Sequence, residues 1–131
     1  MSQTDEERWL ERIWPTLETV MREAGGGVPI PSGTRDRAAL DSEIREQALK
    51  IRPYLEAKQR LLRLEVMSRN LALAFRSQAG AISRSSEFEA ENQKLEALRH
   101  ELEKELAALQ TTYAASLRWL GVLGSLRREL P

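Results

Sequence analysis

The chain of 131 residues has no cysteine, a single histidine and few aromatic side chains. The absence of cysteine excludes a disulfide framework, a zinc–thiolate site and a thiol nucleophile. Leu, Ala, Glu and Arg dominate the composition, while aromatic residues make up only 5%. Unbranched side chains lose little rotamer freedom in a helix, so this composition favours an all-α fold. The length fits one domain, 1–131.

An excess of charge of either sign is also missing, because 20 basic and 20 acidic residues cancel. The chain therefore lacks the basic footprint of a nucleic-acid-binding or membrane-surface protein. No run approaches the roughly 18 apolar residues of a membrane span. The N-terminus is acidic where a signal peptide is basic, so we expect a cytoplasmic location. Arginine far outnumbers lysine, which is typical of a GC-rich bacterial genome.

The first predicted helix spans about residues 5–24. Thr4 and Glu7 have the spacing of a capping box, and acidic residues at 5–7 favour a helix N-terminus. Pro15 lies inside the pattern and predicts either a kink or a helix end at Trp14. The apolar residues share one face at 100° per residue. They are Trp9, Leu10, Ile13, Trp14, Leu17, Val20 and Met21.

Residues 25–35 form a Gly/Pro connector, because three consecutive glycines end the first helix and two prolines follow them. The alternative interpretation is a proline-rich docking motif, for which two prolines are few. A second turn is predicted at Ser83–Ser86, where Ser86 and Glu89 repeat the capping-box spacing. Such a short connection makes the helices on either side antiparallel neighbours.

The second predicted helix, residues 36–82, carries two apolar stripes about 160° apart. One stripe holds Leu40, Ile44, Ala48, Ile51, Leu55, Leu62, Val66 and Leu73. The other holds Tyr54, Ala57, Leu61, Leu64, Leu71, Phe75 and Ile82. A helix that is apolar on two opposed faces needs partners on both sides. Pro53 predicts a kink near Leu49–Arg52, where a hydrogen bond is lost.

The third predicted helix, residues 87–129, has an apolar seam with an 11-residue repeat. The seam holds Leu95, Leu98, Leu102, Leu106, Leu109, Tyr113, Leu117 and Leu120. This spacing favours a nearly straight or slightly right-handed helix pair. Beyond Ser116 a second apolar face appears, and Gly121 and Gly124 predict a close approach of another backbone there.

The predicted fold is a long antiparallel helical hairpin with a shorter N-terminal helix packed on one side, which makes a three-helix, coiled-coil-like bundle. Each long arm would measure about 65 Å and the first helix about 30 Å, at 1.5 Å per residue. The first helix would cover less than half of the hairpin's second face. An apolar face left open in this way usually marks an interface.

Catalytic, metal and cofactor sites find no support in the sequence. His100 lies off the leucine seam and has no serine or cysteine nucleophile to serve. The many glutamates of 87–105 do not form the Glu-x-x-His motif of di-metal bundles, since Ala97 precedes His100 by three positions. The arginines of 52–76 scatter around their helix and form no basic face. We expect a non-enzymatic protein without cofactor, metal or nucleic acid.

One segment resembles a known family. Residues 112–123, Thr-Tyr-Ala-Ala-Ser-Leu-Arg-Trp-Leu-Gly-Val-Leu, are similar to the last helix of flagellar hook-filament junction export chaperones, and Ser68–Phe75 is a second loosely similar stretch. The family's asparagine near the start of the final motif is replaced by Thr111 or Thr112, and the connector at 25–33 is not a family feature. The resemblance implies a small cytoplasmic helical chaperone whose C-terminal helix holds a secreted subunit.

These observations together predict a helical adaptor or chaperone that holds a partner's amphipathic or disordered segment on an open apolar face. The predicted partner-binding residues are Trp119, Val122, Leu126 and Leu130 near the C-terminus, with Leu62, Val66 and Leu73 on the second helix. For Trp119, packing as core against the first helix is the competing interpretation. The alternative function is a homo-oligomeric scaffold, such as a homodimer, without a client.

Overall fold

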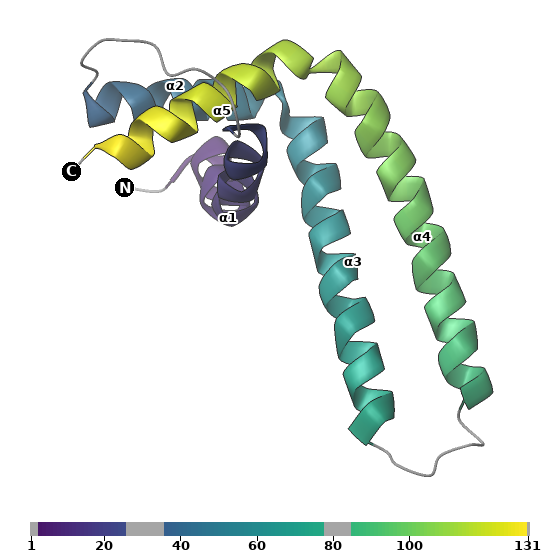
Figure 1. The fold of residues 1–131 in the computed structure, drawn as a ribbon. Helices are drawn as coiled ribbons and strands as arrows, with labels where there is room; N and C mark the ends of the chain where they lie inside the picture. Colours follow the sequence, from purple (N-terminus) through teal and green to yellow (C-terminus); the bar gives the residue numbers. More distant parts are fainter. Residues whose placement is uncertain (1–2, 26–35, 78–84, 131) are drawn as a thin grey trace. The chain divides into compact units, whose positions relative to one another are not determined.

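The computed structural model describes residues 3–25, 36–77 and 85–130, which form five α-helices and no strand (Figure 1). The helices are α1 (Asp5–Gly25), α2 (Arg37–Lys50), α3 (Arg52–Ser77), α4 (Ser85–Thr112) and α5 (Ala114–Glu129). None of the described helices has a stretch long and apolar enough to cross a bilayer. Residues 26–35 of the predicted connector at 25–35, and residues 83 and 84 of the turn predicted at Ser83–Ser86, lie outside the described residues.

The helices divide into two compact units. The first unit comprises Met1–Glu56 and Leu109–Pro131, and the second comprises Ala57–Ala108. In the first unit α1 packs against α5 and α2, and α2 also packs against α5 (Figure 1). Its largest fully buried side chains come from these three helices, from Ile51 and from the first residues of α3: Ile13, Leu17, Val20, Leu40, Ile44, Ile51, Leu55, Leu120 and Leu123.

The start of α1 has the predicted cap. The Thr4 hydroxyl accepts a hydrogen bond from the Glu7 N–H at 3.2 Å, and the Arg8 N–H donates to the Thr4 carbonyl at 3.1 Å. The predicted bounds of 5–24 are therefore confirmed to within one residue. A helix end at Trp14 is wrong, because α1 continues without interruption through Pro15 to Gly25.

Both long predicted helices are interrupted, which corrects the expectation of continuous rods over 36–82 and 87–129. The first interruption is at Ile51, with φ −106° and ψ 25°, inside the region where Pro53 predicts a kink. Pro53 has no N–H to donate to the Leu49 carbonyl, so the ladder of backbone hydrogen bonds has a gap there. The second interruption is at Tyr113, with φ −107° and ψ 22°, directly after two β-branched threonines of low helix propensity.

The interruptions change the architecture from three helices to five in the described part of the chain. The segments beyond them, α2 and α5, join α1 in the first unit, whereas 57–77 of α3 and 85–108 of α4 make up the second unit. In the second unit α3 and α4 run antiparallel and side by side, as predicted (Figure 1). Because α4 begins at Ser85, the predicted cap residue Ser86 lies inside the helix.

The predicted close approach near the C-terminus is confirmed at Gly124. A Cβ placed on Gly124 would lie 2.8 Å from Cβ of Met21 and 3.3 Å from its Sδ. Real Cβ atoms do not tolerate so short a contact, so the glycine allows α5 to pack closely on α1. This contact aligns the C-terminal apolar face with the apolar face of α1.

Candidate protein-binding surface

Exposed apolar side chains are concentrated in the second unit. Among the described residues the large hydrophobic side chains with about half or more of their surface exposed are Val66 (50%), Met67 (57%), Leu73 (55%) and Leu98 (50%). Val66, Met67 and Leu73 belong to α3 and Leu98 to α4, all within Ala57–Ala108. The second unit is thus the part of the described chain that offers large apolar side chains to solvent.

A groove runs between α3 and α4 on one side of the second unit, with a volume of about 390 Å³. It is lined by Arg60, Arg63, Leu64 and Met67 from α3 and by Leu98, Glu101, Leu102 and Glu105 from α4. The Arg60 guanidinium and the Glu105 carboxylate lie 3.6 Å apart across it. In an antiparallel pair this register also places Met67 opposite Leu98. The groove therefore has the Arg60–Glu105 pair at one end and the exposed apolar side chains Met67 and Leu98 at the other.

The charges of the groove are divided between its two walls. The α3 wall contributes two arginines and the α4 wall two glutamates. The division extends along both helices: residues 57–77 carry five basic and one acidic side chain, whereas 85–108 carry seven acidic and three basic ones. Neighbouring helices of opposite charge attract each other, which favours their side-by-side packing. The attraction between Arg60 and Glu105 is modest because both side chains are about half exposed to water.

Leu62, Val66 and Leu73 form a strip on a different side of α3. At 100° per residue the strip lies more than 100° around the helix from Leu64 and Met67. Leu62 is half-buried, while Val66 and Leu73 are exposed. These three residues end the apolar stripe that begins at Leu40, and earlier members of that stripe, Ile51 and Leu55, are fully buried in the first unit. The stripe therefore changes from core to open surface along one helix, as the expectation of an uncovered face requires.

The C-terminal residues predicted to bind a partner occupy a different environment. Val122 and Leu126 are buried at 7% and 8% exposure, so they belong to the packed interior of the first unit rather than to an open face. The reason is that α1 packs on α5 there. Trp119 and Leu130 are half-buried. We therefore remove Val122 and Leu126 from the candidate surface.

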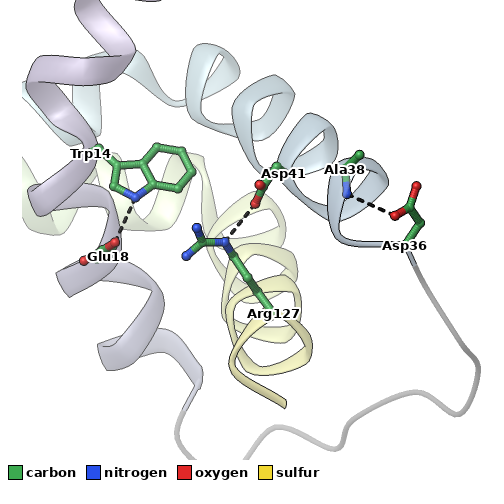
Figure 2. A network of polar contacts seen from close by, with 6 residues as sticks. All are labelled: Trp14, Glu18, Asp36, Ala38, Asp41 and Arg127. Atoms are coloured by element: carbon green, nitrogen blue, oxygen red, sulfur yellow. Dashed lines mark hydrogen bonds and ion pairs between the residues drawn. The ribbon is translucent and has the colours of Figure 1, made fainter. Parts of the chain in front are cut away.

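A polar network holds the same end of α5 in place (Figure 2). The Arg127 Nε donates to Oδ1 of Asp41 on α2 at 2.8 Å, and its guanidinium lies 5.3 Å from the centre of the Trp14 ring on α1. The indole N–H of Trp14 in turn donates to Glu18 at 2.8 Å. Arg127 thus links three helices of the first unit, which is a structural role.

Comparison of the chain with protein-family models, curated proteins and solved structures finds no match. Within the described ranges, acidic side chains and the histidine do not gather into a group of three or more that could hold a metal ion. His100 is exposed on α4.

Sequence reasoning missed Met67 as a surface residue. Its signal is present in the sequence, because Met67 follows Leu64 by three positions and precedes Leu71 by four, the spacing of one helix face. Leu98 was placed in the leucine seam of the third helix and is half exposed. It lies at the edge of that seam, beside the groove, where α3 covers only part of its side chain.

Proposed function

We propose that this protein is a non-enzymatic protein-binding protein, an adaptor or export-chaperone-like molecule, which holds a partner helix on the surface of α3 and α4. The observation that carries the proposal is the concentration of half-exposed apolar side chains in the second unit: Val66, Met67, Leu73 and Leu98. Apolar side chains that are exposed next to one another mark interaction sites, and Met67 and Leu98 line the same groove.

The expected mode of binding is helix-in-groove. A partner's amphipathic helix would place its apolar face on Met67 and Leu98, and its polar flanks would meet the arginines of α3 and the glutamates of α4.

The resemblance to flagellar export chaperones would place a client on the C-terminal helix. The burial of Val122 and Leu126 argues for a client surface on the second unit instead. In that respect the proposed function departs from the mechanism that the resemblance implies, while the class of protein stays the same.

Site-specific photo-crosslinking tests the proposal. A photoreactive phenylalanine derivative replaces Leu98 or Met67, and in a matched control it replaces His100, which is exposed on α4 about 160° around the helix from Leu98. In cells that make the protein naturally, we expect a covalent protein adduct from position 98 or 67 and little from position 100. Equal adducts at all three positions, or none, would contradict the proposal.

A further inference from the structure

We propose that the occupant of the α3–α4 groove is a second copy of this chain, bound about a two-fold axis parallel to the two helices. The inference deepens the proposed function and rests on it, since it names the partner of the same surface. It follows from the way in which charge is distributed over the two walls of the groove.

A self-complementary surface must match itself after a two-fold rotation. Two rotations place the groove of one copy face to face with the groove of the other. If the axis runs parallel to the helices, α3 of one copy covers α4 of the other. If the axis runs across the helices, α3 covers α3 and α4 covers α4.

The charges select the first arrangement. Rotation about an axis parallel to the helices leaves the position of each residue along the axis unchanged. Arg60 and Glu105 of one chain lie at the same level, so Arg60 of each copy comes to lie at the level of Glu105 of the other copy. Arg63 comes near Glu101 in the same way. The crosswise axis would set the basic α3 against α3 and the acidic α4 against α4, so that like charges repel and no arginine of the groove meets a glutamate of the other copy.

The resulting assembly is a four-helix arrangement in which charge alternates around the bundle. Each basic α3 has an acidic α4 as neighbour on both sides, one from its own chain and one from the other copy. The same rotation stacks the exposed side chain of Met67 on Leu98 of the other copy, because these two residues lie at one level of the groove. The contact therefore covers apolar atoms and pairs charges at once.

The available area agrees with a reversible dimer. Residues 57–77 are about 32 Å long and two packed helices are about 20 Å wide. One face of the unit thus offers roughly 600 Å² per copy, so the pair would bury about 1,200 Å² in total, which is the lower limit of stable, specific interfaces. We expect a dimer that dissociates on dilution.

Charge reversal tests the pairing. In a sedimentation-equilibrium dilution series of the full chain we expect a monomer–dimer equilibrium. Arg60→Glu with Arg63→Glu should raise its dissociation constant about ten-fold or more, and Glu101→Arg with Glu105→Arg should do the same. A mixture of these two variants should regain the dimer, because every contact between unlike copies is then complementary. Arg69→Glu, an exposed α3 position outside the groove, is the control and should leave the equilibrium unchanged.

Engineered cysteines test the axis, and the native chain has none to interfere. Under mild oxidation a Met67→Cys chain mixed with a Leu98→Cys chain should form a covalent dimer of unlike chains faster than either variant alone forms a dimer. Preferential linkage of Met67→Cys to itself would overturn the proposal, as would a monomer at every concentration or a mixture of charge variants that stays monomeric.

The photo-crosslinking experiment separates this inference from the proposed function. An adduct at position 98 of twice the chain's mass, containing only this chain, supports a second copy as occupant. An adduct with a different protein, from a chain that sediments as a monomer, overturns the second copy while the proposed function stands. The absence of any adduct overturns both.

Discussion

Replacement of Gly124 by alanine is the sharpest test of how the first unit is built. The added Cβ would lie 2.8 Å from Cβ of Met21, against an optimum of about 3.5–4.0 Å for two carbon atoms. Both atoms are fixed directly to a helix backbone, so a change of side-chain rotamer cannot relieve the contact. Relief requires α1 and α5 to move apart by roughly 1 Å, which loosens the core on either side of the contact.

Two opposing effects determine how much stability the first unit loses in Gly124→Ala. Overpacking of a well-packed core costs about 1–3 kcal/mol. Alanine returns about 1 kcal/mol through its higher helix propensity relative to glycine. Two backbone-fixed carbon atoms at 2.8 Å place this clash in the upper part of that range, about 2–3 kcal/mol, so we expect a net loss of about 1–2 kcal/mol in the free energy of unfolding of the first unit.

Tryptophan fluorescence measures this loss selectively, because Trp9, Trp14 and Trp119 all lie in the first unit. In a urea titration the fluorescence midpoint of Gly124→Ala should fall, with an unchanged slope. Ser125→Ala, at the next position of α5, is the matched control and should change stability by less than about 0.5 kcal/mol. A Gly124→Ala midpoint equal to or above that of the native chain would show that α1 and α5 are not in close contact, and the reasoning would be refuted.

Three further predictions concern single side chains. Leu64→Ala should lower the free energy of unfolding by about 2–4 kcal/mol because Leu64 is buried at 7% exposure. Val66→Ala, at 50% exposure, should lower it by less than about 0.5 kcal/mol. Both losses are read from far-ultraviolet circular dichroism during thermal unfolding, and equal losses would contradict the burial pattern. The buried indole N–H of Trp9 finds no hydrogen-bond partner in the described part of the chain. In urea unfolding, Trp9→Phe should therefore lower the free energy of unfolding by less than about 1 kcal/mol, while Trp9→Ala should lower it by about 3–5 kcal/mol. A Phe variant as unstable as the Ala variant would disprove this. A double-mutant cycle of Asp41→Asn and Arg127→Met should give a coupling energy of about 1 kcal/mol, since this pair is more buried than five surface ion pairs of the described residues, and zero coupling would argue against it.

The helical content and several local details could be predicted because they depend on neighbouring residues. The Thr4 cap, the kink region before Pro53 and the close approach at Gly124 each follow from the chemistry of one or two side chains. The interruption at Tyr113 was missed because threonine and tyrosine lower helix propensity only slightly, and no proline or glycine marks the position.

The candidate surface was predicted in part. Val66 and Leu73 are exposed as expected, since the apolar stripe of α3 continues beyond the residues that the first unit covers. Val122 and Leu126 carry an equally clear apolar pattern but are buried. A helical wheel gives the direction of a face and contains no information on which other helix will cover it.

The sequence by itself determined that the protein is helical, where most helices begin and which side chains share a face, because these features arise from backbone geometry and contacts within a few residues. Only the tertiary structure decided which faces are closed. That outcome depends on two backbone interruptions, at Ile51 and Tyr113, which assign α2 and α5 to the unit of α1. Burial depends on helices that are distant in sequence, and non-helical dihedral angles at a single residue, such as ψ 25° at Ile51 or 22° at Tyr113, end one helix and start the next.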